Sequence, residues 1–187
     1  MDNGPDAITR LLEQLKDKDP VIRENSAYIL GELALQARSL FSNTLKSSEQ
    51  LMKINGLTDQ RHLDEVASIL METLQDTNSW VRGNAADALG KTGSRDALAP
   101  LAELIDDDDK IVRYSAVSAI GEINISEGIE TLICALDDSE WSVRLAAAKA
   151  LERLPDMRAV DALRKTAKDK NHDVRDMSKA ALAKLSA

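Results

Sequence analysis

The residues that could do chemistry are a few rare single groups and one charged pair that recurs along the chain. The sequence has only two histidines, His62 and His172, and one cysteine, Cys134. A zinc site of the usual type needs about four nitrogen or sulfur ligands, so no metal site is predicted. Cys134 stands in an apolar helical run, which favours a core position over a nucleophile. No catalytic residue is predicted.

Phosphate and calcium chemistry are equally poor fits. The sequence has no glycine-rich phosphate loop and no strand to precede one. The acidic run 106–109 could bind calcium weakly, but it lacks the alternating spacing of a calcium loop. A solvated turn between helices is the favoured interpretation of that run. We therefore predict no cofactor.

The charged pair is an aspartate followed six residues later by an arginine, and it occurs five times. The arginine follows valine in four copies, which are spaced 31 residues apart, and isoleucine in the first. Five pairs in identical phase are poor candidates for five active sites, so we predict a structural ladder of charge-assisted hydrogen bonds. Its members are Asp17, Arg23, Asp76, Arg82, Asp107, Arg113, Asp138, Arg144, Asp169 and Arg175.

The elements that must position this ladder are pairs of helices. A leucine recurs twelve residues before each arginine and a small residue three after it, which places apolar side chains on one face of each of two helices. Asp19, Asn78, Asp109 and Asn171 stand where a helix cap is needed, and Ser139 is the candidate in the remaining copy. One pair cannot bury its apolar face alone, so the pairs must stack. The predicted fold is all-α: a right-handed α-solenoid, or alpha-alpha superhelix, of about five helix pairs with a 31-residue period, forming a single domain over residues 1–187.

An insertion at about 33–58 interrupts the period between repeats one and two. Its apolar residues have helical spacing, and Asn55-Gly56 indicates a helix stop. One interpretation is a long second helix in repeat one followed by an extra helix. Another is a degenerate repeat. The segment could dock onto a partner or simply cover the end of the groove.

Composition narrows the class of partner. Residues 59–140 carry a net charge of −12, which opposes binding to nucleic acid, whereas residues 158–187 carry +4. No apolar stretch approaches the length of about 20 residues that a membrane helix needs. The N-terminus does not resemble a signal peptide. We expect a cytoplasmic protein that is a monomer, with a dimer as the alternative.

The stretch 76–90 resembles the short HEAT-like repeat first described in phycobilisome lyases, through Asp76 and the run from Trp80 to Gly90. The resemblance extends over nearly the whole chain except residues 33–58. It is specific for the fold and much less so for function, because members of the family include bilin lyases, scaffolds and adaptors. It implies that the second helix of each pair lines the concave face, which is the usual partner site.

Both tryptophans and both tyrosines fall at positions that vary between repeats, outside the apolar rhythm. Aromatic residues off the core stripe suggest anchors for a partner, although they could also pack between repeats. We predict a strip that binds a helix or loop of another protein. Its residues are Tyr28, Trp80, Asn84, Asp87, Ile111, Tyr114, Ser115, Trp141, Leu145, His172 and Asp176.

The predicted function is therefore a protein-binding scaffold or adaptor, not an enzyme. The alternative is a bilin lyase-like protein or a tetrapyrrole chaperone of the phycobilisome-lyase type. A third possibility is a regulatory subunit that docks through its insertion.

Overall fold

The computed structural model describes residues 7–42 and 60–185. These residues form α-helices and short 3-10 helices, and no strand occurs among them. The predicted all-α class is therefore confirmed. The chain divides into two compact units, Met1–Ala97 and Leu98–Ala187, which are described separately below. A single domain over the whole chain stays a prediction.

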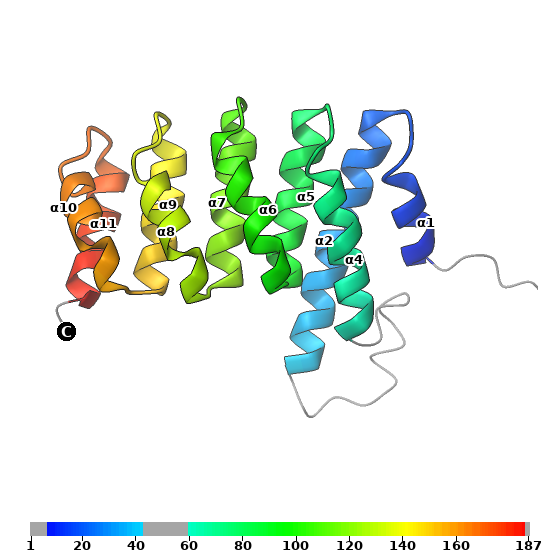
Figure 1. Cartoon of the computed structure of the whole chain (residues 1–187), viewed down its shortest axis with the longest axis horizontal. Helices are drawn as coiled ribbons and strands as arrows, with labels where there is room; N and C mark the ends of the chain where they lie inside the picture. The colour runs from blue at the N-terminus through cyan, green and yellow to red at the C-terminus, as the bar shows by residue number, and fades with distance from the viewer. Residues whose placement is uncertain (1–6, 43–59, 186–187) are drawn as a thin grey trace, which may run out of the picture. The chain divides into compact units, whose positions relative to one another are not determined.

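The first unit contains two helix pairs (Figure 1). Helix α2 packs on α1 and, along much of its length, on α5, while α4 packs on α5. The second helices of the two pairs are thus direct neighbours, as expected for stacked repeats. Its elements are α1 (Ala7–Gln14), α2 (Pro20–Ser42), α4 (Gln60–Thr73), α5 (Ser79–Thr92) and the 3-10 turn η1 (Arg95–Ala97).

Helix α2 is 23 residues long, because residues 33–42 of the predicted insertion continue it. Arg38, in this extension, donates from Nη1 to the carbonyl oxygens of Gly90 and Lys91 at 3.1 and 2.9 Å. These carbonyls lie in the last turn of α5. The carbonyl groups at the end of a helix lack helical N–H donors and carry a partial negative charge, so a guanidinium stabilises them. The long second helix of the first interpretation is present, whereas its extra helix falls on residues 43–58, which lie outside the described part of the chain.

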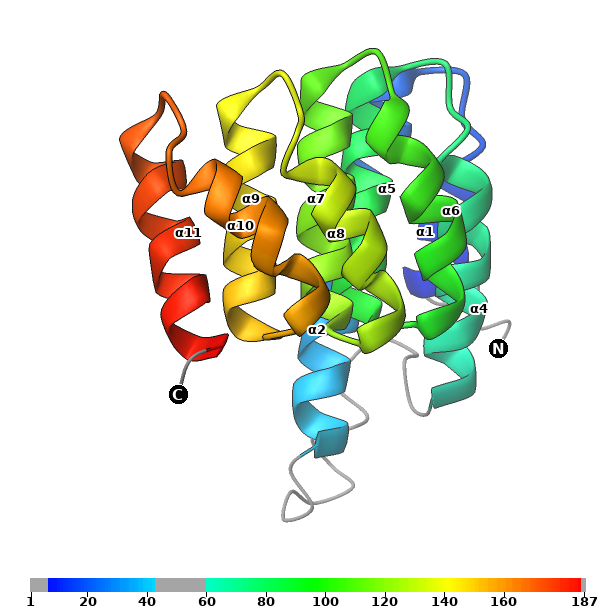
Figure 2. The same ribbon diagram turned by 60° about the vertical axis from the view of Figure 1, so that its left-hand side comes forward.

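The second unit contains three helix pairs. Its first helices, α6, α8 and α10, lie in one layer, and its second helices, α7, α9 and α11, lie in another (Figure 2). Within the second layer α9 packs between α7 and α11. The elements are α6 (Leu98–Glu103), η2 (Leu104–Asp106), α7 (Lys110–Ile123), η3 (Ser126–Gly128), α8 (Ile129–Ala135), α9 (Trp141–Arg153), η4 (Met157–Ala159), α10 (Val160–Thr166) and α11 (His172–Leu185).

Side-chain caps begin the second helices, as predicted from the sequence. The side chain of Asn78 accepts the backbone N–H groups of Trp80 and Val81, and Asp19, Asp109 and Asn171 cap in the same way. The prediction for α9 was wrong, because its N-cap residue is Glu140 and Ser139 donates instead to Asp138. The carboxylate of Asp138 accepts the N–H of Glu140, and this hydrogen bond fixes the turn before α9 without a hydroxyl cap.

The core consists of the periodic aliphatic residues. Leu132, Val143, Ala147 and Leu151 are all at most 1% exposed. Cys134 is exposed, so its predicted core position was wrong. Helix α8 is seven residues long and buries Ile129, Leu132 and Ala135, which leaves Cys134 on its outer side.

Gly121 marks a close approach between α7 and α9. A Cβ atom added there would lie 2.7 Å from the Cβ of Ala150, below normal contact. Alanine is usually about 1 kcal/mol better than glycine inside a helix. We expect Gly121→Ala to lower the free energy of unfolding by about 1 kcal/mol instead, because α9 must move away.

Urea denaturation followed by circular dichroism measures this effect. The matched control is Ala183→Gly, at the same repeat position but exposed in α11. It should also destabilise by about 1 kcal/mol, through helix propensity alone. A Gly121→Ala variant more stable than the wild type would contradict the packing account.

Candidate functional site

The two tryptophans and the two tyrosines lie outside the core. Tyr28 and Trp80 in the first unit are 54% and 55% exposed, and Tyr114 and Trp141 in the second are 44% and 45% exposed. This confirms that they do not pack in the core. Their role in binding a partner stays a prediction.

In the second unit, Trp141 borders a groove between α9 and α11. The groove has a volume of about 480 Å³ and is mostly apolar. One wall is formed by three α9 residues spaced four apart, Trp141, Leu145 and Lys149. The other wall is formed by Asp173, Asp176 and Met177 of α11.

The repeat pattern explains why this groove exists. In α9 the core positions are filled by Val143, Ala147 and Leu151, so residues 141, 145 and 149 fall on the opposite side of the helix. Ala146 and Ala148 are also buried, and their small size lets α9 pack closely against its neighbours. The large side chains are therefore left at the rim.

The charges around the groove are mainly acidic. Asp173 lies 3.2 Å from Nε2 of His172, and Asp176 lies 3.8 Å from Nζ of Lys179, with all four side chains more than half exposed. Exposed pairs of this kind are weak and exchange easily for other partners. The groove can thus take an apolar side chain against the indole and the thioether, with a cation beside the two aspartates.

The predicted set of partner residues overlaps this groove only in part. Trp141, Leu145 and Asp176 line it, and Lys149, Asp173 and Met177 line it without having been predicted. Lys149 stands five residues after its ladder arginine, as Tyr28 does, and Met177 stands two residues after, as Asn84 and Ser115 do. Both are therefore at variable positions of the repeat. Ile111 and Tyr114 on α7 are exposed, and so is His172 on α11.

Ser115 is the predicted residue that the structure contradicts. Its side chain is only 3% exposed, so it is not available to a partner. Position 115 is equivalent to Ala146 in α9, which is also buried, whereas Met177 at the same position of α11 is half-buried. Exposure at this position therefore cannot be inferred from sequence variation alone.

In the first unit, one of the predicted residues, Tyr28, lies beside Lys91. Its ammonium lies 5.4 Å from the centre of the Tyr28 ring and 2.7 Å from a carboxylate oxygen of Glu32. Asn84 and Asp87 on α5 are half-buried, and Trp80 stands exposed at the start of that helix. Leu35, in the extension of α2, is a further exposed apolar residue that the predicted set lacks.

The charged pairs form the predicted ladder, but each rung joins two repeats. Arg23 donates from Nε and Nη2 to both carboxylate oxygens of Asp76, at 2.6 and 2.8 Å. Arg113 does the same with Asp138, and Arg144 with Asp169. Each ladder arginine, including Arg82 and Arg175, also donates from Nη1 to the backbone carbonyl of the aspartate six residues earlier.

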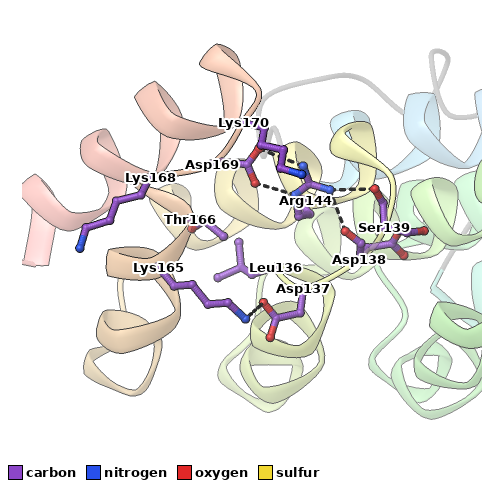
Figure 3. A pocket seen from close by; sticks show the side chains of 10 residues that line it. All are labelled: Leu136, Asp137, Asp138, Ser139, Arg144, Lys165, Thr166, Lys168, Asp169 and Lys170. Carbon is purple, nitrogen blue, oxygen red and sulfur yellow. Dashed lines mark hydrogen bonds and ion pairs between the residues drawn. The ribbon is translucent and has the colours of Figure 1, made fainter.

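Figure 3 shows one rung at close range, where Arg144 lies between the loops before α9 and α11. The hydrogen bond from Arg144 holds the pKa of Asp169 below its usual value. This rung and an outer pair, Lys165 with Asp137 at 2.6 Å, border a polar pocket of about 420 Å³. The carboxylates of Asp76, Asp138 and Asp169 are satisfied by arginine and by backbone N–H groups, which fits a structural role.

Within residues 7–42 and 60–185, no helix is long and apolar enough to cross a membrane. The same residues contain no cluster of three or more His, Cys, Asp or Glu side chains placed to hold a metal ion.

Comparison with protein families finds models of HEAT repeats along the chain. One model, described as HEAT repeats, matches residues 43–121 and 102–183, and a single HEAT repeat model matches residues 7–37. A search of curated proteins finds no match.

Several solved structures are similar to the chain. The complex of CpcE and CpcF of phycocyanin lyase from Nostoc sp. PCC7120 has a TM-score of 0.73 and 20% identity, over 98% of this chain and 67% of that one. Human deoxyhypusine hydroxylase has a TM-score of 0.56 and 20% identity, over 96% and 74%. A designed armadillo repeat protein in complex with the peptide (KR)4 has a TM-score of 0.54 and 20% identity, over 96% and 99%. These likenesses confirm the α-solenoid fold class.

Proposed function

The chain belongs to the HEAT-repeat family, and from that premise we propose that it is a protein-binding scaffold or adaptor rather than an enzyme. Its second unit binds a partner segment in the groove between α9 and α11. The observation that carries the proposal is the half-exposed indole of Trp141 beside Leu145 and Met177, in a groove of about 480 Å³. Tryptophan at the edge of an apolar recess is a frequent hot spot of protein interfaces.

The partner segment places one apolar side chain in the groove and a lysine or arginine beside it. Asp173 and Asp176 line this rim opposite Lys149, and their exposed pairings with His172 and Lys179 are weak enough for a cation of the partner to replace them. A basic residue next to the anchor therefore gains from both carboxylates, whereas an acidic one is repelled. That a designed armadillo relative binds the peptide (KR)4 supports a basic segment as the class of ligand.

A displayed library of random peptides, selected on the wild-type chain, tests this proposal. We expect the selected peptides to combine an aromatic or aliphatic residue with a neighbouring lysine or arginine. Trp141→Ala should weaken their binding by tenfold or more, about 1.4 kcal/mol or greater, because the anchor loses its contact surface. Fluorescence anisotropy of a labelled peptide measures the dissociation constants.

Trp80→Ala is the matched control, since it removes an indole of the first unit that is 55% exposed, compared with 45% for Trp141. It should leave the affinity unchanged, and both variants should keep the wild-type helical content. Peptides that bind the wild type and Trp141→Ala equally well would refute the groove as the site. Loss of helical content in Trp141→Ala would show that the indole supports the fold instead.

The second candidate is a bilin lyase-like protein or tetrapyrrole chaperone. The observation in its favour is the likeness to the phycocyanin lyase complex over 98% of this chain. Mixing the chain with a free bilin separates the candidates, because tetrapyrrole binding changes the visible absorbance and peptide binding does not. A saturable spectral change would favour this second function.

A further inference from the structure

The first helix pair leaves exposed a surface that the later pairs bury. In the second helices that follow another pair of the same unit, the residue before the ladder arginine and the residue six after it are both buried. Val81 and Ala88 occupy these positions in α5 and are at most 1% exposed. A Cβ atom added to Gly31 of α2 would lie 2.9 Å from Ala88, so the two helices are in close contact there.

The second unit repeats this arrangement. Val143 and Ala150 of α9 are at most 1% exposed, and Gly121 of the preceding helix approaches Ala150 in the same way. Val174 and Ala181 of α11 are fully buried at these positions. The residue six after the arginine is therefore a contact point between neighbouring pairs, and the residue before the arginine is buried in the same helices.

In α2 the equivalent residues are Ile22 and Ile29, which are 36% and 42% exposed. Both are large β-branched apolar residues, and Ile29 stands where all four later second helices carry alanine. A solvent-facing end of a repeat stack is ordinarily polar. Two isoleucines at these contact points instead indicate a surface that another element covers.

The ladder gives a second, independent indication that the exposed face of the first helix pair receives a partner. Asp76, Asp138 and Asp169 each accept an arginine of the preceding pair, and their side chains are 11%, 9% and 8% exposed. Asp17 is the equivalent residue of the first pair. Its carboxylate accepts the N–H of Asp19. Within the described residues no arginine or lysine forms an ion pair with it.

We propose that Asp17, Ile22 and Ile29 form a docking face for the last helix pair of a second HEAT-like chain. The partner's ladder arginine pairs with Asp17, and a small-residue face of its second helix covers the two isoleucines. The occupant follows from this chain itself, because the equivalents of Asp17 and Ile29 receive such a helix pair inside each unit, and the equivalent of Ile22 is buried there. The proposal is independent of the groove beside Trp141.

The partner is a different chain rather than a second copy. Four residues after the ladder arginine, Ala27 and Ala148 are fully buried, whereas the residue at this position in α11 is the exposed Lys179. Stacking α11 of one copy on α2 of another would bury the Lys179 ammonium against the isoleucines, which is unfavourable. Arg175 has the same backbone contacts as the other ladder arginines. Its Nη1 donates to the carbonyls of Asp169 and Lys170 at 2.8 and 3.0 Å.

This comparison supplies a probe. The Lys179→Ala chain carries Arg175 with a small residue at that position, so it stands in for the partner. We expect it to assemble head to tail in sedimentation velocity experiments, at least about tenfold more tightly than the wild type. Lys168→Ala makes the same change of charge in the same repeat and should behave as the wild type does.

Three double variants, each adding one substitution to Lys179→Ala, identify the surfaces that are in contact in the assembly. Asp17→Asn and Ile29→Ser should each restore the monomer, while Trp141→Ala should leave the assembly intact. A Lys179→Ala chain that stays monomeric, or one that assembles regardless of Asp17 and Ile29, would overturn the proposal. A wild-type dimer that survives Arg175→Ala would also overturn it, in favour of a symmetric contact between two copies.

Discussion

Replacing Arg144 by alanine is expected to lower the free energy of unfolding by about 3 kcal/mol. Its guanidinium donates at 2.7 and 2.9 Å to the two carboxylate oxygens of Asp169, and at 2.7 and 3.0 Å to the carbonyls of Asp138 and Ser139. The variant leaves the carboxylate of Asp169, only 8% exposed, without its counter-charge. It also leaves two carbonyl groups without their donor.

Urea denaturation at neutral pH measures this loss, and Arg164→Ala is the control. Arg164 pairs with Asp161 at 3.2 Å, but the two side chains are 70% and 95% exposed. That exposed pair should contribute less than about 0.5 kcal/mol. Equal losses for the two variants would mean that the ladder is no more than surface charge.

The pH dependence of the Arg144→Ala effect gives a further check. The hydrogen bond from Arg144 lowers the pKa of Asp169 in the folded state, relative to about 3.9 in the unfolded chain. The stabilisation is therefore complete above about pH 4 and is lost as the pH falls through the folded-state pKa. The difference in stability between wild type and variant should narrow accordingly. A difference that stays constant down to acid pH would mean that the carboxylate is not responsible.

The ladder illustrates how far the sequence predicts the structure. The five aspartates and arginines are evident from their common phase, but the partner of each is not. Arg23 lies six residues after Asp17, yet its carboxylate partner is Asp76, and Asp17 contributes only its backbone carbonyl. Spacing along one chain segment cannot distinguish a contact within a repeat from one between repeats, because both recur with the same period.

The candidate site was likewise predictable only in part from the sequence. That Trp141 and Leu145 stand outside the core follows from the helical period, but the second wall of the groove depends on how α11 packs on α9. The anchoring of α5 by Arg38 likewise joins residues 52 and 53 positions apart, and no local pattern reports it. Contacts between neighbouring helices are set by packing, which a single sequence does not display.

In helix α8, Leu132 and Cys134 are expected to differ sharply in what they contribute to stability. Both residues are apolar and lie two apart in α8, yet Leu132 is 1% exposed and Cys134 is exposed. Two residues turn a helix by roughly 200°, so the two side chains point to nearly opposite sides. Leu132→Ala should therefore lower the free energy of unfolding by about 3 kcal/mol, through lost burial and the cavity that remains.

Cys134→Ala is the matched control, since it also shortens an apolar side chain in the same helix. It should change the free energy of unfolding by less than about 0.5 kcal/mol, because no packed neighbours are lost. Urea denaturation of the two variants under reducing conditions gives the comparison directly. A Cys134→Ala loss as large as that of Leu132→Ala would mean that α8 is rotated about its axis, and the outer surface of the second unit would then have to be reassigned.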